Sequence, residues 1–399
     1  DILMRLIKLF FFLFLLSSCN KYLGTVEPDY SPSKEVTEIF SSNLNILDSK
    51  EGIIFGLTKY PYSKSFSKNF NFSNMQKIAN INEGTEVYSN NNNIFFTKKN
   101  LLTKINKSDN KNKIDYKIVI DKDEEIIQIY EKNDQIFLLT NKSKLFKLVD
   151  DVLNLELDLE TYINSNPILL EDKMIIFSVF GDVLELDLIK YDIKNKGTLL
   201  PLYGFSTNSN SYQYGEYRSY LFNSGSMIFL NMFDNQLQSN YYLEDLNILS
   251  SMNIFEEFVD APFAFNDYLY FIEKKGFLSV FNPITSEILW EVDINSSIKD
   301  YSLSDQGNLA LLTTNKIFIL DDNGRLRFEF LHEIEDPISF IISSNDISIF
   351  NSNGINVFDI NSKQKKDFIK SKFNSQLKII NFKSDIFIND TKVLYQISE

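Results

Sequence analysis

The sequence has almost no cysteine or histidine, the residues that most often bind zinc or carry nucleophilic catalysis. Its 399 residues include one cysteine, Cys19, and one histidine, His332. A single cysteine cannot form a disulfide within the chain, and zinc usually takes most of its ligands from these two residue types. Catalysis by a Ser–His or Cys–His pair would depend on His332 alone. We therefore expect no disulfide framework, no metal site, no cofactor and no enzymatic activity.

Basic residues are outnumbered and glycine is scarce. The chain carries 54 acidic and 40 basic side chains, a net charge of −14. Nucleic-acid affinity comes from lysine and arginine side chains that neutralise phosphates, so this balance argues against nucleic acid as a partner. Only 13 residues are glycine. Because many turns need a residue that tolerates a positive φ, the sequence predicts that asparagine takes such positions.

Residues 1–18 have the pattern of a secretion signal. Arg5 and Lys8 form a positive start, and residues 9–16 are an unbroken apolar run. This run is too short to cross a bilayer, which needs about 20 residues. Residues 16–19, Leu-Ser-Ser-Cys, resemble the lipobox of bacterial lipoproteins. The resemblance implies that Cys19 becomes the acylated N-terminus; the alternative is an ordinary signal peptide in which Cys19 is incidental.

Three segments follow from this interpretation. Residues 1–18 are the signal peptide, residues 19–34 are the acylated cysteine with a polar tether, and residues 35–399 form a single domain. Asn20 follows the cysteine, where aspartate in many Gram-negative lipoproteins specifies retention in the inner membrane. We therefore expect a domain on the periplasmic side of the outer membrane, held there by a lipid anchor.

Short apolar strands in pairs, each pair joined by a polar turn, recur along the domain. The turns are rich in Asn, Asp, Gly and Ser, as in β-hairpins. The first strands of the pairs start at residues 94, 136, 174, 227, 269, 309, 347 and 386. Successive starts lie 38–42 residues apart, except for one step of 53. This period predicts an all-β fold, an eight-bladed β-propeller of four-stranded antiparallel blades, with seven blades as the alternative.

The last repeat has little room beyond its two inner strands. An incomplete blade exposes a strand edge, so we expect a strand from the N-terminal side to close the ring. Residues 62–67 are the first candidate for this strand, and residues 36–40 are the alternative. Residues 43–58 indicate an additional hairpin that has no evident place in the ring.

One repeat is better preserved than the others. It resembles the repeat of quinoprotein-like propellers at Gly276, Leu278, Asn282, Thr285 and Trp290, while Ser286 replaces a glycine. In that family the tryptophan docks between neighbouring blades. The resemblance implies this role for Trp290, and it places Tyr116 and Phe328 at similar positions in other blades.

The lipobox, the short tether and a propeller of this repeat type together resemble the BamB family of outer-membrane assembly lipoproteins. The resemblance extends over residues 19–399 as an architecture, with its sequence motifs concentrated in residues 268–295. It implies a scaffold that binds the periplasmic domains of the β-barrel assembly protein and helps deliver unfolded outer-membrane proteins. The chain would act as a monomer within a hetero-complex and hold extended clients by β-augmentation.

The step of 53 residues marks an insertion in the third repeat, and this insertion is rich in tyrosine. Tyrosine and arginine dominate the energetic centres of protein interfaces. The candidate partner-binding residues are Tyr203, Tyr214, Tyr217 and Arg218. The alternative is a long loop that packs on its own blade.

Other features that could carry chemistry have simpler interpretations. Residues 121–125, Asp-Lys-Asp-Glu-Glu, lack the glycine and the spacing of a calcium-binding loop and indicate a solvated acidic turn. Residues 321–324 predict a turn, and His332 predicts a surface or capping residue. Two alternatives to a scaffold remain open: a polysaccharide-binding or adhesion lipoprotein, and a glycosidase with an Asp–Glu pair across the central channel.

Overall fold

A computed structural model describes residues 53–54 and 70–397, with short internal gaps of which 199–216 and 251–257 are the longest. Cys19 and the segments predicted to be the signal peptide and the tether lie outside this part of the chain. Apart from the single turn of 3-10 helix η1 (Phe72–Asn74), the regular elements of the described residues are all β-strands. Those residues contain no helix that is long and apolar enough to cross a membrane.

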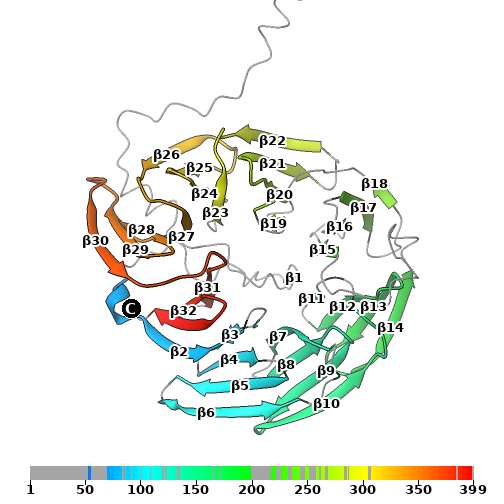
Figure 1. Cartoon of the computed structure of the whole chain (residues 1–399). Helices are drawn as coiled ribbons and strands as arrows, with labels where there is room; N and C mark the ends of the chain where they lie inside the picture. Colours follow the sequence, from blue (N-terminus) through cyan, green and yellow to red (C-terminus); the bar gives the residue numbers. More distant parts are fainter. Residues whose placement is uncertain are drawn as a thin grey trace, which may run out of the picture.

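The strands form antiparallel sheets arranged around a common centre (Figure 1). The predicted propeller of four-stranded blades is confirmed, and strand pairing divides the described residues into eight sheets. Each predicted hairpin forms the two middle strands of a blade. From the innermost strand outward, the first four blades are β3 (Val87–Ser89), β4 (Asn93–Lys98), β5 (Leu101–Asn106), β6 (Asp109–Lys117); β7 (Ile126–Lys132), β8 (Gln135–Thr140), β9 (Lys144–Val149), β10 (Val152–Asp158); β11 (Ile168–Leu170), β12 (Lys173–Phe177), β13 (Asp182–Asp187), β14 (Ile193–Thr198); and β15 (Tyr217–Leu221), β16 (Ser226–Asn231), β17 (Gln236–Tyr242), β18 (Ile248–Ser250).

The other four blades repeat this order, and the last of them takes its outermost strand from the N-terminal side of the chain. In addition, the two-residue strand β1 (Ile53–Ile54) lies on the inner edge of blade 3. Blades 5 to 8 are β19 (Phe263–Phe265), β20 (Tyr268–Ile272), β21 (Phe277–Asn282), β22 (Glu287–Asp293); β23 (Ile298–Leu303), β24 (Leu309–Thr313), β25 (Lys316–Leu320), β26 (Leu326–Leu331); β27 (Pro337–Ile342), β28 (Asp346–Asn351), β29 (Gly354–Asp359), β30 (Lys365–Lys370); and β31 (Lys378–Phe382), β32 (Asp385–Asn389), β33 (Val393–Ile397), β2 (Gln76–Asn80).

The hydrophobic core lies between the blades. The middle strands are almost fully buried, as in β24, whereas the outermost strand β30 is mostly exposed. Each apolar cluster joins two neighbours; one combines Tyr270 and Trp290 of blade 5 with Leu311 of blade 6. Another joins Ile94 of blade 1 to Phe387 of blade 8. Burial of apolar surface therefore stabilises the ring as a whole and leaves no blade as a separate folding unit.

Strand β2 closes the ring. It pairs antiparallel with β33, with Lys77 opposite Tyr395 and Asn80 opposite Val393. The prediction of an N-terminal closing strand is confirmed, but the segment assigned to it was wrong. Residues 62–67 and 36–40 lie outside the described residues, and the partner of β33 is β2. Sequence patterns missed β2 because an outermost strand with one exposed face needs few apolar residues.

Side-chain oxygens close many of the turns. At the turn between the second and third strands, the last residue of the second strand or the one after it accepts backbone N–H bonds; these residues are Thr140, Ser178, Thr313, Asn351 and Asn389. At the turn between the third and fourth strands, Asp187, Asn282, Asp321 and Asp359 do the same. The turn predicted at residues 321–324 is therefore confirmed.

Asparagine does not take the positive-φ positions as expected. Among the described residues, nine that are not glycine have a positive φ, and Asn295 is the single asparagine among them. Three of the nine are aspartates, Asp150, Asp151 and Asp336. Asparagine instead contributes some of the side-chain acceptors that close turns, as in Asx-turns.

Aromatic residues on outermost strands dock on the next blade. The Trp290 indole N–H donates to the backbone carbonyl of Asp322 at 2.9 Å. A Cβ on Gly324, whose φ is +75°, would lie 2.8 Å from the Trp290 ring, so only glycine fits there. In blade 1 the Tyr116 hydroxyl donates to Asp151 of blade 2 at 2.7 Å. Phe328 of blade 6 lies under the Lys363 ammonium of blade 7. The docking implied for all three aromatics is confirmed.

We predict that the β2–β33 pairing is required for cooperative folding. Replacing residues 76–80 with Gly-Ser-Gly-Ser-Gly keeps the chain length and removes the strand. Four paired residues at roughly 0.5–1.5 kcal/mol each predict a loss of about 2–6 kcal/mol in the free energy of unfolding. Urea unfolding followed by circular dichroism measures this loss, with Lys77→Arg as the control that keeps the strand. A replaced variant as stable as the parent would contradict the assignment of β2.

Candidate functional site

The insertion of the third repeat connects blade 3 to blade 4. Tyr203 and Tyr214 lie in residues 199–216, outside the described part of the chain. Tyr217 and Arg218 are backbone-paired in β15 with Asn231 and Leu230. The prediction that these two residues belong to a loop is wrong, because they begin the innermost strand of blade 4. Their role in partner binding stays a prediction.

An exposed phenylalanine lies next to the start of this insertion. Strand β14 ends at Thr198, whose hydroxyl donates to Asp182 at 2.8 Å. The backbone N–H of Asp182 in turn donates to the Ser178 hydroxyl, which closes the turn before β13. This turn carries Phe180 with 62% of its surface exposed. The end of blade 3 at which the insertion begins therefore carries a large exposed apolar side chain.

Sequence reasoning did not single out Phe180. The available signal was an aromatic residue at the tip of a hairpin turn, directly before Gly181, where polar residues are usual. Ile189 has a similar exposure of 61% but lies in the turn between β13 and β14, at the opposite end of the same blade. Single exposed apolar residues are common, so the position of Phe180 beside the insertion is what makes it a candidate.

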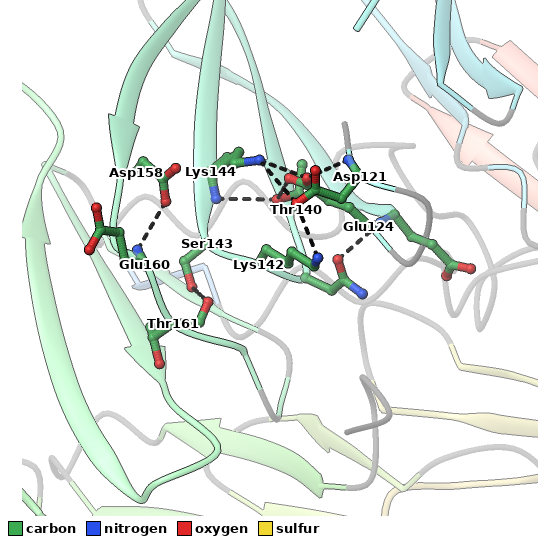
Figure 2. A network of polar contacts seen from close by, with 11 residues as sticks. Asp121, Glu124, Thr140, Lys142, Ser143, Lys144, Asp158, Glu160 and Thr161 are labelled. Atoms are coloured by element: carbon green, nitrogen blue, oxygen red, sulfur yellow. Dashed lines mark hydrogen bonds and ion pairs between the residues drawn. The ribbon is translucent and has the colours of Figure 1, made fainter. Parts of the chain in front are cut away.

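A buried carboxylate organises blade 2 (Figure 2). Glu124 belongs to the connection from β6 of blade 1 to β7 of blade 2, and its side chain is fully buried. It accepts hydrogen bonds from the Thr140 hydroxyl at 2.7 Å and from the Lys144 ammonium at 2.8 Å. The backbone N–H of Asp121 also donates to it, at 3.1 Å. Two turns of the chain are thus tied to one carboxylate.

The same turn is also bonded to the connection that leaves blade 2. Ser143 donates to the backbone carbonyl of Thr161 at 2.8 Å, and the backbone N–H of Ile163 donates to Asn141. Hydrogen bonding to Glu124 raises the pKa of Lys144, with burial opposing this effect. Glu124 therefore corrects the interpretation of residues 121–125 as a solvated acidic turn. Within the described residues no group of three or more His, Cys, Asp or Glu side chains could hold a metal ion.

Polar side chains also link the innermost strands of neighbouring blades. Glu131 of β7 accepts from the Tyr88 hydroxyl of β3 at 2.8 Å and from the Asn90 amide at 3.1 Å. The Ser339 hydroxyl of β27 donates to Asp300 of β23. These carboxylates hold blades 1 and 2, and blades 6 and 7, together around the centre. Both carboxylates act as hydrogen-bond acceptors between blades.

The single histidine is buried. His332 follows β26 and is 3% exposed, and its Nδ1 accepts the backbone N–H of Ile334 at 3.3 Å. The predicted capping role is confirmed, whereas a surface position is wrong. Burial lowers the pKa of His332, and backbone hydrogen bonding at Thr313 and Lys316 opposes this shift in part. The imidazole is therefore neutral at pH 7.

Comparison with known proteins supports the fold. No family model and no curated protein matches the sequence. The structure of BamB from Moraxella catarrhalis is similar, with 11% identity, a TM-score of 0.50 and coverage of 81% of this chain and 97% of that one. The designed protein Ika8 is also similar, with 10% identity, a TM-score of 0.55 and coverage of 81% and 100%. Sqt1 from Saccharomyces cerevisiae is 11% identical, with a TM-score of 0.50 and coverage of 84% and 100%. The chain thus has a BamB-like propeller fold.

We predict that Glu124 and Lys144 depend on each other. Glu124→Gln leaves the partly exposed Lys144 ammonium without its carboxylate, and Lys144→Met leaves the buried Glu124 carboxylate without its cation. The second change should reduce the free energy of unfolding by about 3 kcal/mol, and the first by less. The double variant should lose clearly less than the sum of the two. Chemical denaturation of the four proteins measures the coupling. Asp121→Asn is the control, since its carboxylate is 65% exposed and its ion pairs with Lys142 and Lys144 should each contribute less than about 1 kcal/mol. Strict additivity would contradict the network.

We predict that the chain loses stability as the pH falls below the ordinary histidine pKa of about 6.5. The lowered pKa means that the unfolded chain takes up a proton at His332 before the folded chain does. The free energy of unfolding therefore decreases from about pH 6.5 down to the folded pKa. His332→Gln should flatten this part of the pH profile. Because there is one histidine, proton NMR reads its titration directly. A titration at or above pH 6.5 would contradict the prediction.

Proposed function

We propose that the chain is a protein-interaction scaffold of outer-membrane β-barrel assembly. It binds the periplasmic domains of the β-barrel assembly protein and assists unfolded outer-membrane proteins. The observation that carries the proposal is the likeness to BamB, which extends over 81% of this chain and 97% of that structure. In this proposal the chain takes no part in catalysis.

The N-terminal residues support the same proposal. Residues 16–19 match the lipobox pattern, and the chain's single cysteine stands at the position that would be acylated. A lipid at Cys19, followed by a polar tether, would hold the propeller at the periplasmic side of the outer membrane. A propeller that acts as a scaffold needs such a location to meet a membrane-embedded assembly protein.

We further propose that the partner docks on the end of blade 3 that carries Phe180. This end has a large exposed aromatic side chain, and the tyrosine-rich insertion starts from it after Thr198; aromatic anchors dominate binding energies at interfaces. The partner would cover Phe180, while Ile189 at the opposite end of the blade would stay in solvent.

The test is co-purification of the acylated protein with its partners from solubilised membranes. Phe180→Glu should reduce the recovered β-barrel assembly protein at least tenfold, since it puts a charge where the complex would bury an apolar side chain. The matched control is Ile189→Glu, which changes a side chain of similar exposure on the other end of the blade. Equal recovery with both variants would contradict the docking site, and no recovery with the parent would contradict the assembly role.

The anchor is tested separately. Cys19→Ser should release the protein from the membrane fraction and leave its melting temperature unchanged, because Cys19 precedes all the described strands in the sequence. Membrane fractionation and circular dichroism measure the two quantities. A Cys19→Ser variant that stays in the membrane fraction would contradict lipid attachment at this residue.

A further inference from the structure

Strand β1 lies at the centre of the ring, on the inner edge of blade 3 (Figure 1). It pairs antiparallel with β11, with Ile53 opposite Leu170 and Ile54 opposite Leu169. Blade 3 is thereby a five-stranded sheet, whereas every other sheet of the described residues has four strands. Part of the segment 43–58, which had no place in the predicted ring, thus occupies a strand edge that faces the centre.

The inner edge of β11 is suited to accept another strand. An unpaired edge offers backbone N–H and C=O groups, and proteins usually protect such edges with charged residues or proline. Charged residues occur in the innermost strands β7, β15, β23 and β31, and Pro337 begins β27. Strand β11 consists of Ile168, Leu169 and Leu170, so it has neither a charged residue nor a proline. The short strands β3 and β19 also lack both.

Only two residues of β1 are paired with β11. Two register pairs make a weak strand contact, because each backbone hydrogen bond contributes little net free energy. The segment stays bound through its covalent connection, which gives it a local concentration on the order of millimolar. A strand held in this way can be displaced by another that offers more pairs.

We propose that the inner edge of β11 is a binding site for an extended apolar polypeptide, and that Ile53–Ile54 occupies this site in the free protein. The ligand would add a strand antiparallel to β11, with backbone hydrogen bonds for affinity and apolar side chains on both faces. The proposal depends on the strand pairing alone, and it holds whether or not the chain acts in β-barrel assembly.

The first experiment tests whether the segment occupies β11 in solution. In a Cys19→Ser background, Ile53→Cys with Leu170→Cys places two thiols on opposed residues of the β1–β11 pair. Opposed residues of antiparallel strands lie about 4.5–5.5 Å apart at Cα, within the range of a disulfide. Ile53→Cys with Phe265→Cys is the control, since β19 belongs to another blade. We expect at least tenfold more cross-linked chain for the first pair, measured by mass spectrometry after mild oxidation.

The second experiment tests the binding site itself. The probe is a fluorescent peptide with the sequence of residues 51–58, Glu-Gly-Ile-Ile-Phe-Gly-Leu-Thr, added to the full chain. The variant Ile53→Asp with Ile54→Asp should release the internal strand and bind the peptide at least tenfold more tightly than the parent, by fluorescence anisotropy. A peptide with proline at the positions of Ile53 and Ile54 should not bind, because proline lacks the N–H group.

Each result decides the proposal. The proposal is supported if the first cysteine pair cross-links and the released variant binds the peptide but not the proline-containing peptide. Equal cross-linking of both cysteine pairs would overturn the occupancy of β11 by Ile53–Ile54. A folded released variant that binds the peptide no better than the parent would overturn the binding site. A melting temperature equal to that of the parent shows that the released variant is folded.

Discussion

Closure of the ring by strand β2 is the constraint on which the rest of the structure depends. Each blade buries its apolar side chains against the next one, so an open ring would expose one such surface at each end. The cluster of Ile94 with Phe387 lies at this closure, where β2, which precedes blade 1 in the chain, pairs with β33 of blade 8. The free energy of every interface between blades is therefore coupled to a pairing between segments more than 300 residues apart.

The polar residues of the described blades follow the same logic. Carboxylates and amides are used to hold turns and to fasten one blade to the next, as Glu124, Glu131 and Asp321 do. A buried carboxylate is stable only when its oxygens accept hydrogen bonds, which these residues receive from neighbouring turns and strands. In the described blades these three carboxylates thus have a structural role.

The sequence predicted the middle strands of the blades correctly because their signals are local. Runs such as Leu309-Ala-Leu-Leu312 are buried on both faces and are bounded by turn residues, so pattern alone identifies them. The closing strand and the insertion could not be placed in this way. Strand β2 is half exposed and has a weak hydrophobic pattern. Tyr217 and Arg218 belong to a strand through their pairing with β16, which their local sequence does not indicate. The burial of Glu124 depends on Thr140 and Lys144, whose approach no local pattern reveals.

These features narrow what the ring offers to a partner. Its inner carboxylates already bind neighbouring blades, and its middle strands are covered on both faces. Two kinds of group could still contact another chain: exposed side chains at turn tips, such as Phe180, and strand edges such as that of β11, where β1 pairs through two residues. Both kinds of group recognise polypeptides, the first through apolar contact and the second through strand pairing. In the proposed scaffold role, the specificity for a partner would depend on the tips and edges that the partner contacts.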